Sequence, residues 1–324
     1  MQATSQERDG IVVSGDNHAS CDSLARNEVF IRSQGMSRKV TSVVTAHQQR
    51  EGAGFLIRRA FPTHGIDLVD PFLMLDEVGP VDYGPGEAIG APDHPHRGFE
   101  TVSYILKGEK LHEDSTGKTQ LIGTGDVQWM TAGAGIVHSE MPSPAMQKHG
   151  GHAHGFQIWV NLPAAEKYAE PGYQYLRAAD IPKATSADGL IEVTVVAGAA
   201  FGVSAAIGTR TPVWLQDWNV QPGGEARLAI DPGFNAAIYV FEGSVALGPE
   251  RAPVERSQLA VLGQGNEIEI AAGPGGGGRF LLLAGAPLAE PVARYGPFVM
   301  NTEAEIMTAV RDYQSGRMGM IERA

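Results

Sequence analysis

The pattern of hydrophobic and polar positions divides the chain into a polar leader and a long region of short apolar runs. Residues 1–38 are rich in Ser, Asn, Asp, Gln and Gly and hold few large apolar side chains, so we expect a flexible leader. Beyond it, β-branched and aromatic runs are separated by Gly and Pro, which is typical of strands joined by turns. The runs are VTSVVTAH (40–47), FLIRRAF (55–61), TVSYIL (101–106), DVQWM (126–130) and FQIWVNL (156–162). Short strands with frequent turns predict an all-β sandwich or barrel.

The second half of the chain repeats the pattern of the first half. Residues 103–108 (SYILKG) resemble residues 238–243 (IYVFEG) at an offset of 135. Residues 125–133 (GDVQWMTAG) resemble residues 265–273 (GNEIEIAAG) at an offset of 140. Because internal repeats indicate repeated structural units, we expect two related antiparallel β-barrels.

We place the two barrel domains at residues 39–165 and 166–324, the second with a helix near its end. Thr302 and Glu305 have the spacing of a capping box, which marks a helix N-terminus, and Gly316 is a suitable stop. The apolar residues that would share one face of this helix are Ile306, Ala309, Val310 and Tyr313. We therefore expect the helix to pack on a barrel.

The composition limits the functions to consider. The chain has 324 residues, of which 43% are hydrophobic, and this is enough to bury a sizeable core. Its 25 basic and 37 acidic residues give a net charge of -12, which disfavours direct binding to nucleic acid. One cysteine, Cys21, excludes an intramolecular disulfide. No run approaches the ~20 apolar residues that cross a bilayer, and the leader lacks a signal peptide's apolar segment. We expect a cytoplasmic protein without membrane contact.

Two short segments carry residues that could hold a transition metal. The first is HPHRGFE, with His94, His96 and Glu100, and the second is HSE, with His138 and Glu140. Alternate residues of a strand share a face, so each segment could present its imidazoles and carboxylate to one side. A mixed nitrogen and oxygen set suits Fe(II), Mn(II), Ni(II), Cu(II) or Zn(II) better than Mg²⁺ or Ca²⁺. The residues leave open which of the two glutamates is the ligand.

Longer motifs around these segments resemble the pirin family, whose members are iron-dependent proteins of the cupin superfamily. The motifs are DPFLMLDE (70–77), DHPHRGFETVSYILKGEKLHED (93–114), GDVQWMTAGAGIVHSEMP (125–142), QIWVNLP (157–163) and GPFVMNT (296–302). The resemblance runs from about Lys39 to the C-terminus. It implies a bicupin, that is, two cupin barrels in one chain.

The resemblance also implies the metal ligands. In pirins these are the two histidines of HPH and the His and Glu of the second motif, here His94, His96, His138 and Glu140. This assignment leaves Glu100 as a residue that could orient an imidazole. We expect one Fe(II) per chain, with other divalent transition metals possible. All ten histidines lie at or before His154, so the second barrel is expected to be metal-free.

The activity that the resemblance implies is that of a quercetin 2,3-dioxygenase. A flavonol would be deprotonated at its 3-hydroxyl and cleaved by O2 with loss of carbon monoxide. Glu140 would be both a metal ligand and the catalytic base. The partners would then be O2 and a flavonol-like small molecule. The alternative is a non-enzymatic regulator that changes its surface with the oxidation state of iron and binds a protein partner, either a transcription factor or a metabolic enzyme.

Overall fold

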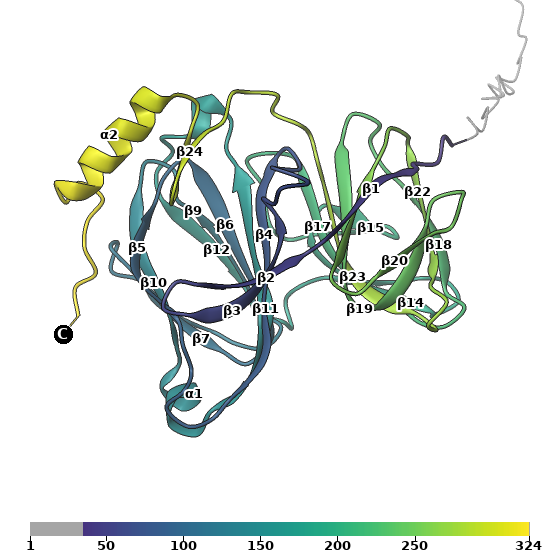
Figure 1. Ribbon diagram of the computed structural model, residues 1–324, viewed down its shortest axis with the longest axis horizontal. Coiled ribbons are helices and arrows are strands. Elements are labelled where there is room, and N and C mark those ends of the chain that lie inside the picture. The colour runs from purple at the N-terminus through teal and green to yellow at the C-terminus, as the bar shows by residue number, and fades with distance from the viewer. Residues whose placement is uncertain (1–34, 324) are drawn as a thin grey trace, which may run out of the picture. The chain divides into compact units, whose positions relative to one another are not determined.

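The computed structural model describes residues 35–323, and nearly all of them lie in strands or the turns between strands (Figure 1). The predicted all-β architecture with two barrels and a C-terminal helix is confirmed. Two helices and one short 3₁₀ turn accompany the strands: α1 (Pro144–His149), η1 (Ala164–Glu166) and α2 (Glu303–Gln314). No helix within the described part of the chain has the length and apolar character needed to span a membrane.

The first barrel is built from two antiparallel sheets. The larger has seven strands in the order β12-β9-β6-β11-β4-β3-β2. Its strands are β2 (His47–Glu51), β3 (Phe55–Phe61), β4 (Phe72–Tyr83), β6 (Phe99–Lys107), β9 (Val127–Thr131), β11 (Gly151–Asn161) and β12 (Gly172–Leu176). The smaller sheet has the order β5-β10-β7-β8. Its strands are β5 (Ala91–His96), β7 (Lys110–Asp114), β8 (Thr119–Ile122) and β10 (Ile136–Pro142).

The second barrel is one ten-stranded sheet with the path β1-β21-β19-β23-β17-β14-β13, to which β18, β20 and β22 pair. Its strands are β1 (Val40–Thr45), β13 (Lys183–Thr185), β14 (Ile191–Ala197), β17 (Val213–Val220), β18 (Glu225–Ala229), β19 (Asn235–Leu247), β20 (Ala252–Glu255), β21 (Gln258–Leu262), β22 (Glu267–Ala272) and β23 (Gly278–Gly285). Two small hairpins complete the fold, β15 (Ala199–Ala200) with β16 (Val203–Ser204), and β24 (Ala293–Tyr295) with β25 (Phe298–Met300).

The two barrels share one hydrophobic core. Side chains of the first barrel, such as Trp129 and Phe156, pack in the same buried cluster as Tyr239 and Leu281 of the second. A buried tyrosine hydroxyl in this region has a hydrogen-bond partner, as burial usually requires. The Tyr239 hydroxyl donates to Glu77 Oε2 at 2.7 Å, across the contact between the barrels. The shared core explains how the second barrel can support the first without carrying its site.

Both ends of the described chain cross to the other barrel. Strand β1 follows the predicted leader directly, yet it pairs with β21 of the second barrel. Arg38 is buried and donates to the carbonyl oxygens of Asp231 and Gly265. Residues 1–34 of the predicted leader lie outside the part of the chain that the structure describes. The domain limits at 39 and 165 stay a prediction.

Helix α2 begins with the predicted capping box, in which Thr302 and Glu305 bond to each other's backbone. Its buried residues Ile306 and Ala309 pack with Val137 of the first barrel and with β25. The helix therefore packs on the outside of the first barrel, beside the β24–β25 hairpin (Figure 1). The expectation that it packs on a barrel is confirmed.

Strand pairing also shows which positions of the second barrel correspond to the predicted ligands. In the first barrel β5 pairs with β10 and places His94 opposite His138. In the second, β18 pairs with β22 and places Leu228 opposite Ile268. The offset of 140 read from the sequence was therefore misplaced, since it matched β9 with β22. The equivalent positions are Leu228, Ile230, Ile268 and Ile270, all buried in the core of the second barrel. Aliphatic side chains there cannot coordinate a metal.

Candidate metal centre

Strands β5 and β10 bring three of the four predicted ligands together. The imidazoles of His94, His96 and His138 each offer a nitrogen, and these atoms lie within 4.8 Å of one another. The ring centroids of His94 and His138, which face each other across the strand pair, are 4.3 Å apart. Pro95, between the first two histidines, lies on an edge strand, which is where sheets tolerate proline.

The hydrogen bonds of the three rings leave one nitrogen of each free to bind a metal. Nδ1 of His94 lies 2.7 Å from the Pro92 carbonyl oxygen, and Nδ1 of His96 lies 3.4 Å from that of Pro297. A carbonyl only accepts, so both rings carry their proton on Nδ1 and keep a lone pair on Nε2. The buried Nε2 of His138 has no hydrogen-bond partner among residues 35–323. An unpaired buried nitrogen beside two others fits a metal ion.

The protonation of these rings is also suited to a metal. Burial, reinforced by the neighbouring His94, lowers the pKa of His96 to about 3. Burial and the adjacent imidazoles lower the pKa of His138 well below its usual value. Both rings are therefore neutral at physiological pH, which is the form that coordinates metals.

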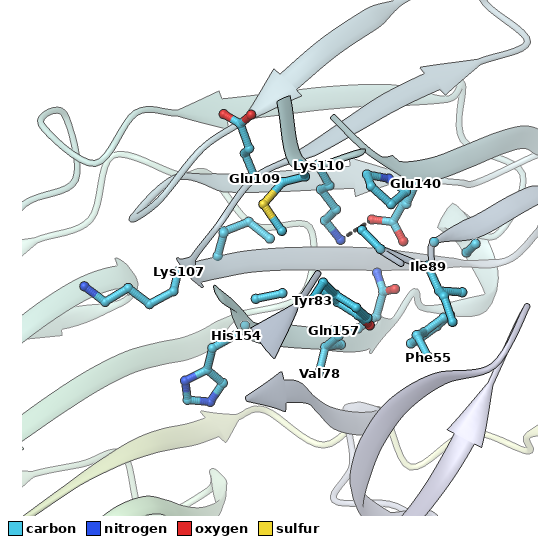
Figure 2. Close-up of a pocket in the computed structure, with 18 of the residues that line it drawn as sticks. Phe55, Val78, Tyr83, Ile89, Lys107, Glu109, Lys110, Glu140, His154 and Gln157 are labelled. Carbon is cyan, nitrogen blue, oxygen red and sulfur yellow. Dashed lines mark hydrogen bonds and ion pairs between the residues drawn. The ribbon is translucent and has the colours of Figure 1, made fainter. Parts of the chain in front are cut away.

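Glu140 lies two residues after His138, and its Oε1 is already engaged. Lys110 Nζ contacts this oxygen at 2.6 Å, and Ser103 Oγ donates to it at 2.8 Å. Figure 2 shows the ammonium and the carboxylate facing each other. Burial opposes ionisation, but the charge of Lys110 and the hydrogen bonds from Lys110 and Ser103 outweigh it and hold the pKa of Glu140 well below its usual range. The group is thus an ionised carboxylate with Oε2 left for another partner.

Glu100 does not face the imidazoles, which corrects the expectation that it shares their side. Its Oε1 accepts from Thr131 Oγ1 at 2.6 Å. On β6, Ser103 points toward Glu140, whereas the alternate residues Val102 and Tyr104 belong to the core shared with the second barrel. Glu100 is an even number of residues from Val102 and Tyr104, so its side chain faces the same side of β6 as theirs. The turn between β5 and β6 breaks the alternation that would have joined it to His96.

A pocket opens beside Glu140 (Figure 2). Its cavity volume is about 100 Å³, which is below the usual range of small-molecule sites, and the pocket is partly open to solvent. Polar groups on its walls include Lys110, Glu140, His154 and Gln157. The larger apolar side chains that line it are Phe55, Val78, Tyr83, Ile89, Met146 and Phe156. The pocket therefore combines aromatic walls with a few charged groups next to the candidate metal centre.

Sequence reasoning missed the residues that support the ligands. Lys110 and His112 lie on β7, which pairs with β10 and places His112 opposite Glu140. Asp114, two residues further on, is also buried, and burial opposes its ionisation. Hydrogen bonds from His112, Thr116 and Tyr173 outweigh that effect and hold the pKa of Asp114 well below its usual range. The spacing of His112 and Asp114 on one strand face was the available signal.

Comparisons with known proteins agree with the motifs. The Pirin family profile matches residues 54–160, and the profile of the Pirin C-terminal cupin domain matches residues 215–319. Pirin from Homo sapiens is 43% identical over 293 residues, covering 90% of this chain and 97% of that protein. A pirin-like protein from Solanum lycopersicum is 44% identical over 298 residues, covering 91% of this chain and 97% of that protein.

A solved structure shares most of the architecture. The crystal structure of quercetin 2,3-dioxygenase from Acinetobacter baumannii has a TM-score of 0.83 and 37% sequence identity, and it covers 88% of this chain and 100% of that chain. The family that the HPH and HSE motifs indicated is thus supported over both barrels. The chain belongs to the pirin family.

Proposed function

We propose that the protein is a metal-dependent dioxygenase of the quercetin 2,3-dioxygenase type, which uses O2 to cleave a flavonol or a similar enolisable compound. The observation that carries this proposal is the convergence of three imidazoles beside a carboxylate that borders an aromatic-lined pocket. The similarity to the Acinetobacter baumannii enzyme supports the reaction class.

The proposed ligands are His94, His96, His138 and Glu140, holding one Fe(II) per chain. A metal ion there would supply Lewis acidity toward a substrate hydroxyl and redox chemistry with O2. The free Nε2 of His138 and the fixed Nδ1 protons of the other two rings support this ligand set.

Glu140 would accept the substrate proton, and Lys110 would stabilise the charge that its removal leaves. Because Lys110 and Ser103 hold Oε1 of Glu140, Oε2 is the oxygen left to coordinate or to accept the proton of the 3-hydroxyl. A carboxylate with a lowered pKa is a weak base, so it can accept this proton only from a hydroxyl that has been made acidic. The Lys110 ammonium at the pocket wall would also stabilise the negative charge of the resulting enolate.

The pocket walls would orient a flat aromatic substrate. Tyr83 offers an apolar face, and Gln157 donates to Ser103 Oγ, which in turn donates to Glu140 (Figure 2). His154 is fixed by a 2.8 Å contact between its Nε2 and Glu77 Oε1, which anchors this side of the pocket to the second barrel.

The test is aerobic turnover by the iron-loaded protein with a panel of flavonols and other enolisable compounds. We expect O2 and a flavonol to be consumed together and carbon monoxide to be released. Glu140→Gln should lose turnover even in molecules that retain metal. Glu109→Gln, which changes another carboxylate of the same pocket, should retain it. Iron-loaded protein that leaves every compound intact would refute the proposal and favour an iron-dependent regulator.

Metal content gives a separate test. The purified protein should bind about one metal per chain, because the corresponding positions of the second barrel are aliphatic. His96→Ala should lose this metal, whereas His149→Ala, on an exposed helix end, should keep it. Two tightly held metals per chain, or full retention after His96→Ala, would show that the ligands are assigned wrongly.

A further inference from the structure

His138 differs from the other two imidazoles in what holds its Nδ1. The partners of His94 and His96 are backbone carbonyl oxygens, which can only accept a hydrogen bond. The partner of His138 is Nδ1 of His112, at 3.4 Å. A neutral imidazole nitrogen can either donate or accept, so this contact alone does not decide which nitrogen of His138 carries the proton.

The surroundings of His112 settle that question. Its Nε2 lies 3.3 Å from Asp114 Oδ2 and 3.1 Å from the Tyr173 hydroxyl. The tyrosine donates its own proton to Asp114 Oδ2, so its oxygen is free to accept. Both neighbours of Nε2 therefore act as acceptors, and the His112 proton must lie on Nε2. This leaves Nδ1 of His112 with a lone pair that can only accept from His138.

We propose that His112, itself fixed by Asp114 and Tyr173, is the positioning residue that selects the tautomer of His138. The selected form carries its proton on Nδ1 and presents the Nε2 lone pair to the metal. The carbonyls of Pro92 and Pro297 fix the proton of His94 and His96 on Nδ1. The buried hydrogen bonds from Asp114 through His112 fix the proton of His138 on Nδ1 in the same way. This inference rests on the proposed metal site but not on the dioxygenase reaction.

The substitution Asp114→Asn tests the chain with little change of shape. Asp114 Oδ1 accepts from the Thr116 and Lys118 backbone N–H groups at 2.6 Å and 3.4 Å, so the oxygen of an asparagine should stay on that side. Its amide would then donate toward His112 Nε2. The proton of His112 would move to Nδ1, and the proton of His138 would be forced onto Nε2, where the metal should bind.

Two measurements on the full-length protein detect this change of tautomer and do not require enzymatic turnover. Nitrogen-15 NMR of the histidine rings in the metal-free protein should place the His138 proton on Nδ1 in the wild type and on Nε2 in Asp114→Asn. Titration with Ni²⁺ against a competing chelator should show an affinity ~10–100-fold lower in Asp114→Asn.

The matched control is Glu113→Gln, one residue earlier on β7, whose carboxylate contacts Arg323 instead of the histidine chain. It should leave both readouts unchanged. Tyr173→Phe, which keeps Asp114, should also keep the His138 proton on Nδ1. A His138 proton on Nε2 in the wild type would overturn the inference, and this holds even if Asp114→Asn does not fold. Wild-type Ni²⁺ affinity in a folded Asp114→Asn would overturn it as well. Neither result depends on whether a flavonol is cleaved.

Discussion

Lys167 is a buried lysine that holds together three segments next to the candidate metal centre. Its side chain is 1% exposed. Nζ donates to the Gly98 carbonyl at 2.8 Å, to Asn161 Oδ1 at 2.8 Å and to the Val299 carbonyl at 3.0 Å. Gly98 lies in the turn that follows the HPH strand, so this ammonium fixes the exit of that strand. We therefore predict that Lys167→Met destabilises the fold.

The magnitude follows from the three oxygens. Methionine fills a similar volume but donates no hydrogen bond, so each oxygen loses its ammonium donor. At about 1 kcal/mol per buried group left unpaired, the low end of the usual range, the loss in the free energy of unfolding is about 3 kcal/mol at pH 7. Urea unfolding followed by tryptophan fluorescence measures it. Lys148→Met, at an exposed position of α1, is the control and should change stability by less than about 0.5 kcal/mol.

The effect should also depend on pH in a defined direction. Burial lowers the pKa of Lys167 from 10.5 to about 8. Between these values the unfolded chain holds a proton that the folded chain has lost, so wild-type stability rises with pH relative to Lys167→Met. At 1.36 kcal/mol per pKa unit, the gap widens by at most about 3 kcal/mol. A gap that stays constant or narrows from pH 7 to 10.5 would refute the reasoning, as would a loss at pH 7 below about 1 kcal/mol.

Three further predictions concern single side chains. Glu140→Gln should weaken Ni²⁺ binding, whereas Glu100→Gln should not, because Glu100 faces away from the imidazoles; equal losses in chelator competition would contradict this. Gly98→Ala should destabilise the fold by about 2–4 kcal/mol in urea unfolding, because φ is +88° and the new Cβ would lie 2.0 Å from the Val299 carbonyl oxygen; an unchanged midpoint would exclude that clash. Arg38→Met should cost about 2–3 kcal/mol and lower the melting temperature, because the buried Gly265 carbonyl and the partly buried Asp231 carbonyl lose a charged donor; an unchanged melting temperature would show that the segment before β1 is dispensable.

The sequence by itself determined the class of fold and the family. Alternating apolar runs between Gly and Pro identify strands because side-chain direction in a strand follows a local period of two. The capping box at Thr302 is also a local signal, since its bonds join residues three apart. The HPH and HSE motifs identify the three clustered histidines, because each motif is short and lies within one strand. Local rules of this kind need no knowledge of the partner strand.

The tertiary structure decided which residues face the same space. Glu100 is close in sequence to His96, but the turn at Gly98 reverses the parity of the next strand and turns its carboxylate away. Lys110 meets Glu140 across 30 residues because β7 and β10 pair in one particular register. The same pairing brings His112 to His138.

The second barrel shows the same limit. The internal repeat was visible in the sequence, but the matching of its strands depended on which strands pair, and one of the two offsets was misplaced. A shift of one residue in register moves every side chain of a strand to the opposite face. A one-dimensional pattern can therefore name candidate ligands, while strand register and turns decide which of them, and which supporting groups, converge on one point.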